Sequence, residues 1–150
     1  MKRVVVFGVL ASMMTILAAC GSDEERLSTE DFLKQGNAIC AAGTTAIDDV
    51  AAEMFASGEE PTPEQLTTFG NDVLVPNVQN QIDGIKALNP PADLDEEVGQ
   101  MLADAQTALD KLKDDPVTAL SGEVDPFADA NVQATAIGLT ACAGDDAGSG

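Results

Sequence analysis

The most constraining feature of this 150-residue sequence is a stripe of apolar and small residues that recurs every three or four positions between residues 32 and 54. Such spacing places residues on one face of a long amphipathic helix. The stripe consists of Phe32, Gly36, Ile39, Cys40, Gly43, Ile47, Val50, Ala51 and Met54. Ser28 and Asp31 resemble a capping box, with Asp in place of the usual Glu, and predict the helix start. Gly36 and Gly43 predict that another segment approaches this face closely.

A second helical segment is predicted from Thr62, where Pro63 at the first helical position and Gln65 three residues after Thr62 form a start signal. Its apolar positions are Leu66, Phe69, Val73, Val78, Ile82 and Ile85. Pro76 lies between the first three and the last three, so we expect a kink or two abutting short helices there. The segment ends at Asn89, before two consecutive prolines.

A third helix is predicted to begin near Ala92 and to stop before Asp115 and Pro116. Its predicted buried face is Leu94, Val98, Met101, Leu102, Ala105, Leu109 and Leu112. A short helical turn is expected over residues 117–120. Asp125 is predicted to cap a final helix that runs toward Cys142. The apolar positions of this last helix are Phe127, Ala130, Val132, Ala134, Ile137 and Leu139.

No segment alternates apolar and polar residues with the period of two that is typical of a strand. Several helices joined by short connections therefore predict an all-α fold, an antiparallel bundle of about four helices over residues 28–143. Residues 144–150 contain only Gly, Asp, Ala and Ser, and we expect this tail to be disordered.

The N-terminus has the composition of an export signal. Lys2 and Arg3 precede an apolar run over residues 4–17, which is short for a membrane span but suits a signal peptide. The run closes with Leu17-Ala18-Ala19-Cys20. We therefore expect residues 1–19 to be a removable signal peptide.

Leu17-Ala18-Ala19-Cys20 resembles the lipobox of bacterial lipoproteins. The resemblance implies that Cys20 carries a diacylglyceryl group and becomes the mature N-terminus. Two acyl chains suffice for stable anchoring, so the implied location is the extracytoplasmic face of the cell membrane. Residues 20–27 would then be the lipidated cysteine and an acidic tether. The alternative is an ordinary signal peptide cut after Ala19.

Cys40 and Cys142 remain once Cys20 is assigned to the anchor. Export places them in an oxidising compartment, where a lone pair in a small domain is usually a disulfide. Such a bond would close a loop of about a hundred residues, for which chain entropy gives roughly 4.7 kcal/mol. The alternative is a redox or metal-binding thiol pair, but the spacing is not Cys-x-x-Cys and the chain has no His.

The charge and composition exclude several functions. The formal net charge is −19, and loss of Lys2 and Arg3 with the signal would leave about −21. Such a surface repels phosphate backbones, which excludes nucleic acid as a partner. It indicates solubility and mutual repulsion, or alternatively an acidic face for a basic partner or loosely held cations. Without His, Tyr or Trp, the chain lacks the commonest general base and the aromatic platforms for sugars.

No catalytic motif is present, and we predict a non-enzymatic protein without a cofactor. Serine-hydrolase chemistry lacks both a His base and a Gly-x-Ser-x-Gly turn. Calcium is the best metal candidate, but neither of the two acidic stretches that could hold it matches the spacing of an EF-hand loop. One stretch contains Glu123, Asp125 and Asp129, and the other contains Asp145 and Asp146 of the tail. We therefore predict no metal site.

Together with the lipobox, four further segments resemble those of a group of small, uncharacterised helical lipoproteins from actinomycete-type bacteria. They are Asp31-Phe32-Leu33, Asn37-Ala38-Ile39-Cys40, Ile85-Lys86-Ala87-Leu88-Asn89-Pro90-Pro91-Ala92-Asp93-Leu94 and Gly138-Leu139-Thr140-Ala141-Cys142. The resemblance implies a secreted helical domain with paired cysteines and brings no catalytic residues.

Two functions remain open. The domain is expected to be an interaction or structural module of the cell envelope, with an envelope protein as its partner. Alternatively, an apolar interior pocket binds a lipid or another small apolar ligand, with Gly36, Gly43 and the Pro76 kink providing the space.

Overall fold

A computed structural model describes residues 26–122 and 124–144 of the chain. The predicted signal peptide over residues 1–19, the lipidation site Cys20 and most of the tether lie outside the described residues. So do Glu123, Asp145, Asp146 and the tail from residue 145 onward.

Helix α1, Thr29–Met54, is the long amphipathic helix that the apolar stripe predicts. Ser28 caps it, since its side chain accepts a hydrogen bond from the backbone N–H of Asp31. The stripe is buried at Phe32, Gly36 and Cys40 but only partly buried farther along the helix, and Val50 is 37% exposed. The predicted buried face is therefore correct for the first half of α1 and wrong at Val50.

The second segment is one rod of three pieces: helix α2, Pro63–Thr68, the π-helical segment η1, Phe69–Leu74, and helix α3, Val75–Lys86. Thr62 and Gln65 form the predicted capping box. Pro76 lies in the first turn of α3. Proline is tolerated there because its missing N–H is not needed for a hydrogen bond in the first turn of a helix. The expected irregularity near Pro76 is thus a π-helical stretch just before it.

Helix α4 spans Asp95–Asp114, so it begins three residues later than the predicted start near Ala92. Residues 92–94 form a turn in which the N–H of Leu94 bonds the carbonyl of Pro91, 3.0 Å away. The first turn of α4 is acidic and its last turn carries Lys111 and Lys113, which complements the helix dipole at both ends.

The C-terminal region is made of short elements. Helix α5, Pro116–Leu120, begins at its cap Asp115, and helix α6 spans Ala128–Ile137. Gly138 ends α6 with φ of 101°, a left-handed conformation that glycine adopts without penalty. A 3-10 segment, η2, Thr140–Cys142, follows.

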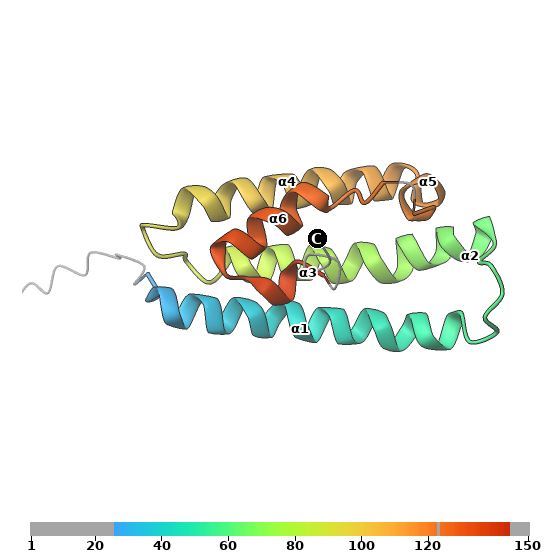
Figure 1. The fold of residues 1–150 in the computed structure, drawn as a ribbon, viewed down its shortest axis with the longest axis horizontal. Helices are drawn as coiled ribbons and strands as arrows, with labels where there is room; N and C mark the ends of the chain where they lie inside the picture. Colours follow the sequence, from blue (N-terminus) through green and yellow to red (C-terminus); the bar gives the residue numbers. More distant parts are fainter. Residues whose placement is uncertain (1–25, 123, 145–150) are drawn as a thin grey trace, which may run out of the picture.

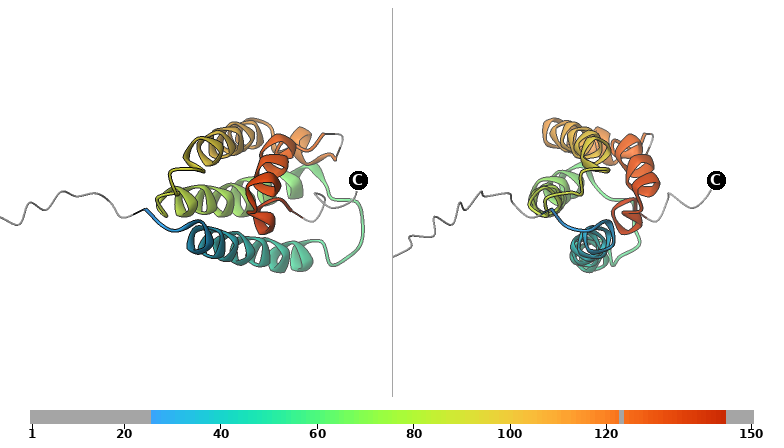
Figure 2. Two further views of the ribbon diagram at one scale, coloured as in Figure 1. Left: turned by 60° about the vertical axis from the view of Figure 1, so that its left-hand side comes forward. Right: turned by 90° about the vertical axis from the view of Figure 1, so that its left-hand side faces the viewer.

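The elements form an antiparallel bundle with three well-packed sides and one open side. Helix α1 packs against α3, α3 against α4, and α4 against α6. The fourth side is closed mainly where η2 meets α1. Viewed end-on, α1, α3, α4 and α6 lie around a common centre (Figure 2), and α6 covers only part of the length of α1 (Figure 1). The all-α prediction is confirmed.

The disulfide between Cys40 and Cys142 joins α1 to η2 across the fourth side, with 4.9 Å between the two Cα atoms. The predicted pairing is confirmed. Asn37 reinforces this junction, because its side chain donates to the carbonyl of Gly138 at 3.0 Å and accepts from the N–H of Ala141 at 2.8 Å. The disulfide and the two hydrogen bonds of Asn37 therefore hold the segment after α6 against α1.

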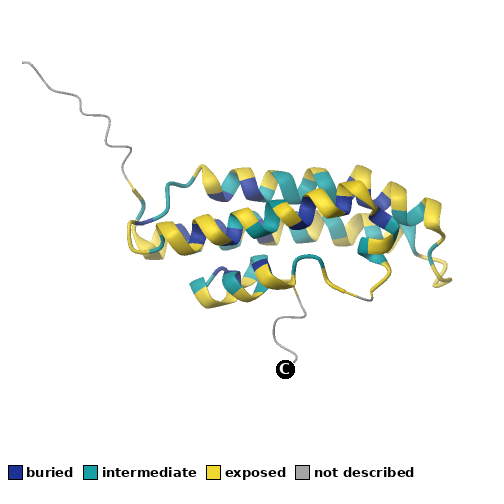
Figure 3. Ribbon diagram, turned by 90° about the horizontal axis from the view of Figure 1, so that it is seen from above, coloured by how far each residue is buried: buried dark blue, intermediate teal, exposed yellow. Residues whose placement is uncertain are grey.

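Buried side chains form two clusters along the bundle axis. The one beside the disulfide contains Phe32, Cys40, Ile85, Val98, Met101, Ala134, Leu139 and Ala143. The other, toward α5, contains Ile82, Leu109 and Leu112. Buried residues lie on the inward faces of the helices, while the outward faces are exposed (Figure 3).

Helix α6 corrects one prediction. Val132, expected on the buried face, is 69% exposed, whereas Ala130 and Ala134 are buried. A helix turns about 100° per residue, so a residue two positions from both Ala130 and Ala134 lies on the opposite side. The stripe of α6 is thus narrower and more alanine-rich than expected.

Candidate functional site

A cleft of about 300 Å³ opens on the fourth side of the bundle. Helix α1 lines it with Cys40, Thr44 and Ile47. Helices α3 and α4 supply Val78, Gln81, Ile82, Ile85, Met101, Leu102 and Ala105. The remaining wall comes from α6 and the segments around it, including Phe127, Ala130, Asn131 and Cys142. Helices α1, α3 and α4 and the α6 region therefore each contribute residues to the lining of the cleft.

The cleft lies where α6 and the disulfide leave the fourth side open. Within the described residues, α6 does not pack closely against α1, and Gly138, Leu139 and η2 connect the two. Cys40 and Cys142, which are both in the lining, form one wall. The loop before α6 brings Phe127 to the cleft, and Phe127 packs against the cluster of Ile82, Leu109 and Leu112. The walls are therefore mainly aliphatic and aromatic.

Two polar side chains in the lining make no hydrogen bond to the described part of the chain. Thr44 and Gln81 are both partly buried, and neither side chain makes a hydrogen bond within residues 26–122 and 124–144. The Gln81 carboxamide lies against Gly43: a Cβ atom at Gly43 would be 2.3 Å from its Nε2 atom. The absence of a side chain at Gly43 thus lets Gln81 lie between α1 and α3.

The acidic residue in the lining, Asp125, has a structural role. One carboxylate oxygen accepts a hydrogen bond from the N–H of Phe127 at 2.8 Å, and the other accepts from the side-chain amide of Asn131 at 3.0 Å. These bonds fix the loop before α6. The predicted cap is wrong, because the N-cap residue of α6 is Phe127 and no side chain caps the helix start. The described residues contain no group of three or more acidic or cysteine side chains placed to hold a metal ion, and Asp129 is not in the lining.

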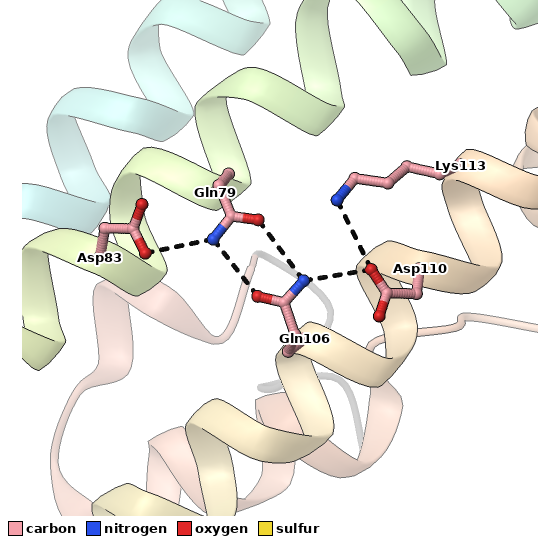
Figure 4. Close-up of polar contacts among 5 residues, drawn as sticks. All are labelled: Gln79, Asp83, Gln106, Asp110 and Lys113. Atoms are coloured by element: carbon pink, nitrogen blue, oxygen red, sulfur yellow. Dashed lines mark hydrogen bonds and ion pairs between the residues drawn. The ribbon is translucent and has the colours of Figure 1, made fainter.

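A second polar cluster joins α3 to α4 away from the cleft (Figure 4). The carboxamides of Gln79 and Gln106 bond each other in both directions, at 3.3 and 3.4 Å. Asp83 accepts from Gln79, and Asp110 accepts from both Gln106 and Lys113. Because these amide groups satisfy one another, the cluster sets the register of two helices and leaves little unsatisfied capacity for a ligand.

A third cluster joins α4 to α6. Asp104 accepts hydrogen bonds from the side-chain amides of Gln100 at 3.1 Å and Gln133 at 2.7 Å. These bonds stabilise the carboxylate and lower the pKa of Asp104, with Gln100 contributing most. The Oε1 atom of Gln133 is buried and has no protein partner among the described residues. The cluster attaches α6 to α4.

The segment that follows the predicted anchor is fixed to one end of the bundle. Arg26 donates to the carbonyl of Pro90 at 2.8 Å and forms an ion pair with Asp95 at 3.1 Å. The N–H of Leu27 bonds the carbonyl of Asn89, and Leu27 packs against the first core cluster. The expected tether thus differs from the structure at its last two residues, which belong to the domain.

Of the three residues expected to provide space for a pocket, only Gly43 borders the cleft. A Cβ atom at Gly36 would lie 2.5 Å from a methyl of Leu139, so Leu139 already fills the space at that glycine. Gly43 borders the cleft through Gln81, whereas Pro76 is not part of the lining. The close approach predicted at both glycines is confirmed, although side chains make it. Gln81, Thr44 and Phe127 were not predicted as site residues.

No helix within the described ranges is both long and apolar enough to cross a membrane. No protein-family model matches the chain, and neither a curated protein nor a solved structure matches it significantly.

Proposed function

We propose that the protein is a lipoprotein of the extracytoplasmic face of the cell membrane, anchored through Cys20, whose helical domain is a non-enzymatic interaction or structural module. The observation that carries the anchor is the sequence Leu17-Ala18-Ala19-Cys20, which directly follows a charged and then apolar N-terminus. The attachment of Arg26 and Leu27 to one end of the bundle supports this arrangement.

Anchoring through Cys20 would attach the lipid at one defined end of the bundle. Arg26 is bonded to Pro90 and Asp95, and five residues, 21–25, separate it from Cys20. The six residue-to-residue steps from Cys20 to Arg26 span at most about 20 Å. The end that contains the α3–α4 connection would then lie near the lipid surface, and the end that contains α5 would be displayed away from it. The net charge of −19 favours separation from anionic headgroups.

Metabolic labelling with an alkyne fatty acid in a bacterium that carries out lipoprotein maturation tests the anchor. We expect the protein to be labelled, to fractionate with membranes, and to lose both properties when Cys20 is replaced by serine. Ser22→Ala, two residues away, is the matched control and should be labelled normally. Unchanged labelling of the Cys20→Ser variant would contradict the proposal.

The cleft favours a second candidate function, the binding of a small apolar ligand. Aliphatic and aromatic side chains line it, and two of its polar side chains lack partners within the described part of the chain. Pre-formed, mainly apolar concavities with a few convergent polar groups are typical of ligand sites. Native mass spectrometry of protein purified from its host separates the two functions: a reproducible bound small molecule supports the second, and an empty protein that crosslinks to an envelope protein supports the first.

A further inference from the structure

We propose that the cleft binds an uncharged molecule with an apolar body the size of two fused rings and one hydroxyl or carbonyl group, which bonds Gln81 and Thr44. This inference rests on the second candidate function and specifies the class of ligand. Three properties of the cleft support it: volume, the two unengaged polar side chains and the distribution of charge.

The volume sets the size of the apolar body. An apolar cavity of about 150 Å³ accommodates one benzene ring in a protein interior. The cleft measures about 300 Å³, twice that figure, and lies at the lower end of the range for small-molecule sites. Its apolar lining includes Ile82 of α3, Met101 of α4 and Phe127 just before α6. A body of two fused rings therefore matches the volume of the cleft, whereas a complete long-chain lipid would exceed it and extend into solvent.

The unengaged side chains define the polar group of the ligand. An apolar body seated in the cleft shields the Gln81 carboxamide and the Thr44 hydroxyl from water, so a ligand that also bonds them avoids the cost of leaving them without a partner. Gln81 offers both donors and an acceptor, and Thr44 offers a hydroxyl, so either a hydroxyl or a carbonyl group on the ligand is satisfied. Gly43 is essential to this geometry because any side chain there would displace the Gln81 amide.

The charges around the cleft exclude an anionic ligand and give no advantage to a cation. The lining contains no Lys or Arg, and the chain carries a net charge of −19, so a carboxylate would be desolvated without a counter-ion. Asp125 is the acidic residue of the lining, and both of its oxygens already accept hydrogen bonds from Phe127 and Asn131. An uncharged ligand is the best match.

Three naphthalene probes with the same two-ring body test the inference: naphthalene, 2-naphthol and 2-naphthoate. The chain has no Trp or Tyr, so naphthyl fluorescence anisotropy is measured with little protein background. The protein used is residues 20–150 with Cys20→Ser, which includes every described residue. We expect 2-naphthol to bind about five- to tenfold more tightly than naphthalene, as one added hydrogen bond would give. We expect 2-naphthoate to bind at least about tenfold more weakly than 2-naphthol.

Two substitutions assign the binding to the cleft. Ala105→Phe places a ring in the cleft and should abolish binding of all three probes, whereas Ala46→Phe on the exposed face of α1 should leave binding unchanged. Gln81→Leu keeps the apolar volume and removes the carboxamide. It should reduce the preference for 2-naphthol over naphthalene to less than about twofold, since naphthalene makes no hydrogen bond.

A measurement without substitutions guards against misfolded variants. Residues 20–150 contain two methionines, Met54 and Met101, and Met101 lines the cleft while Met54 does not. Ring currents from bound 2-naphthol should therefore shift the Met101 methyl resonance and leave that of Met54 in place. The same titration can be made with the native sequence at these positions.

The outcomes separate the two levels of the proposal. If no probe binds and the Met101 methyl does not shift, the cleft is not a ligand site and the second candidate function fails with the inference. If naphthalene and 2-naphthol bind equally and Gln81→Leu changes nothing, the ligand site stands and the assignment of its polar group is wrong. Tightest binding of 2-naphthoate would overturn the argument from charge.

Discussion

The two halves of α1 carry the same apolar periodicity but have different surroundings. In residues 29–40 the stripe is buried at Phe32, Gly36 and Cys40, where η2 and Leu139 cover it. In residues 41–54 no residue is buried, and Val50 is 37% exposed. The comparison shows that periodicity determines which face of a helix is apolar, whereas burial depends on whether another element reaches that face.

The difference follows from helix length. At 1.5 Å per residue, the 26 residues of α1 extend about 39 Å, whereas the ten residues of α6 extend about 15 Å. Helix α6 and η2 therefore close the fourth side of the bundle over part of its length, and the cleft lies along this incompletely covered side. The first half of α1 therefore contributes buried side chains to the core, and the second half leaves apolar surface accessible.

Removing the disulfide should have the largest effect on this contrast. Replacing Cys40 and Cys142 with alanine should lower the free energy of unfolding by about 4 kcal/mol, because the bond constrains an unfolded chain over a separation of 102 residues. Urea unfolding of residues 20–150, with Cys20 replaced by serine, measures the loss. Reduction of the unsubstituted protein should reproduce it.

Hydrogen exchange shows where the loss occurs. Amides of η2 and of the first half of α1 should lose protection most, while those around Leu109 between α3 and α4 should change less. An equal loss of amide protection throughout the bundle would show that the two regions unfold together, and would contradict the proposed difference between them.

Two phenylalanines probe the packing of the two ends. Phe32 is fully buried, so Phe32→Ala should cost about 3 to 4 kcal/mol through lost contacts and a cavity. Phe55, just after α1, is partly exposed and makes an edge-on contact with Phe69, with 5.3 Å between ring centroids. Phe55→Ala should cost about 1 kcal/mol. Thermal or urea unfolding compares the variants, and similar losses would refute the proposed difference.

Alanine substitutions at two glycines should change the stability by smaller amounts and in opposite directions. A Cβ atom at Gly36 would lie 2.5 Å from buried Leu139, so Gly36→Ala should destabilise the protein by about 1 to 2 kcal/mol. Gly99 lies within α4 in open space, and Gly99→Ala should stabilise it by about 0.5 to 1 kcal/mol. The same urea titration measures both. A stabilising Gly36→Ala would mean that Leu139 moves away at little cost.

The sequence predicts much of this fold because local signals and packing agree. The caps at Ser28 and Thr62 depend on residues three positions apart, and the structure shows both. The pairing of Cys40 with Cys142 follows because the third cysteine, Cys20, belongs to the expected lipobox. Two errors have local causes. The turn after Pro91 delays the start of α4, and Val132 lies on the exposed side of a helix whose apolar stripe is narrow.

The cleft could not be predicted in the same way. It depends on which side of the bundle a short last helix leaves uncovered, and apolar periodicity does not contain that information. Gly43 gave a signal of close approach, but the sequence does not reveal that Gln81 is the residue that approaches. The paired amides of Gln79 and Gln106 were also missed, since polar residues 27 positions apart show no pattern before the helices are docked.

The smallest predicted effect concerns Asp104, which joins α6 to α4. Hydrogen bonds from Gln100 and Gln133 lower its pKa below the ordinary value of 3.8. A lowered folded-state pKa stabilises the protein above 3.8, and this contribution disappears as the pH falls through 3.8 and then through the folded-state pKa. Asp104→Asn should therefore destabilise the protein at pH 7 and have less effect at pH 3, as measured by urea unfolding.

The stability of Asp104→Asn must be compared with that of the wild type at each pH, because lowering the pH has a second, opposing effect on stability. Protonation of many carboxylates relieves the repulsion that accompanies a net charge of −19, so the wild type alone reports both effects together. Asp129→Asn, on the same short helix that Asp104 holds, removes one charge without removing the bond to Gln133 and serves as the control. If both variants show the same pH dependence, the effect is general charge and α6 is not held through Asp104.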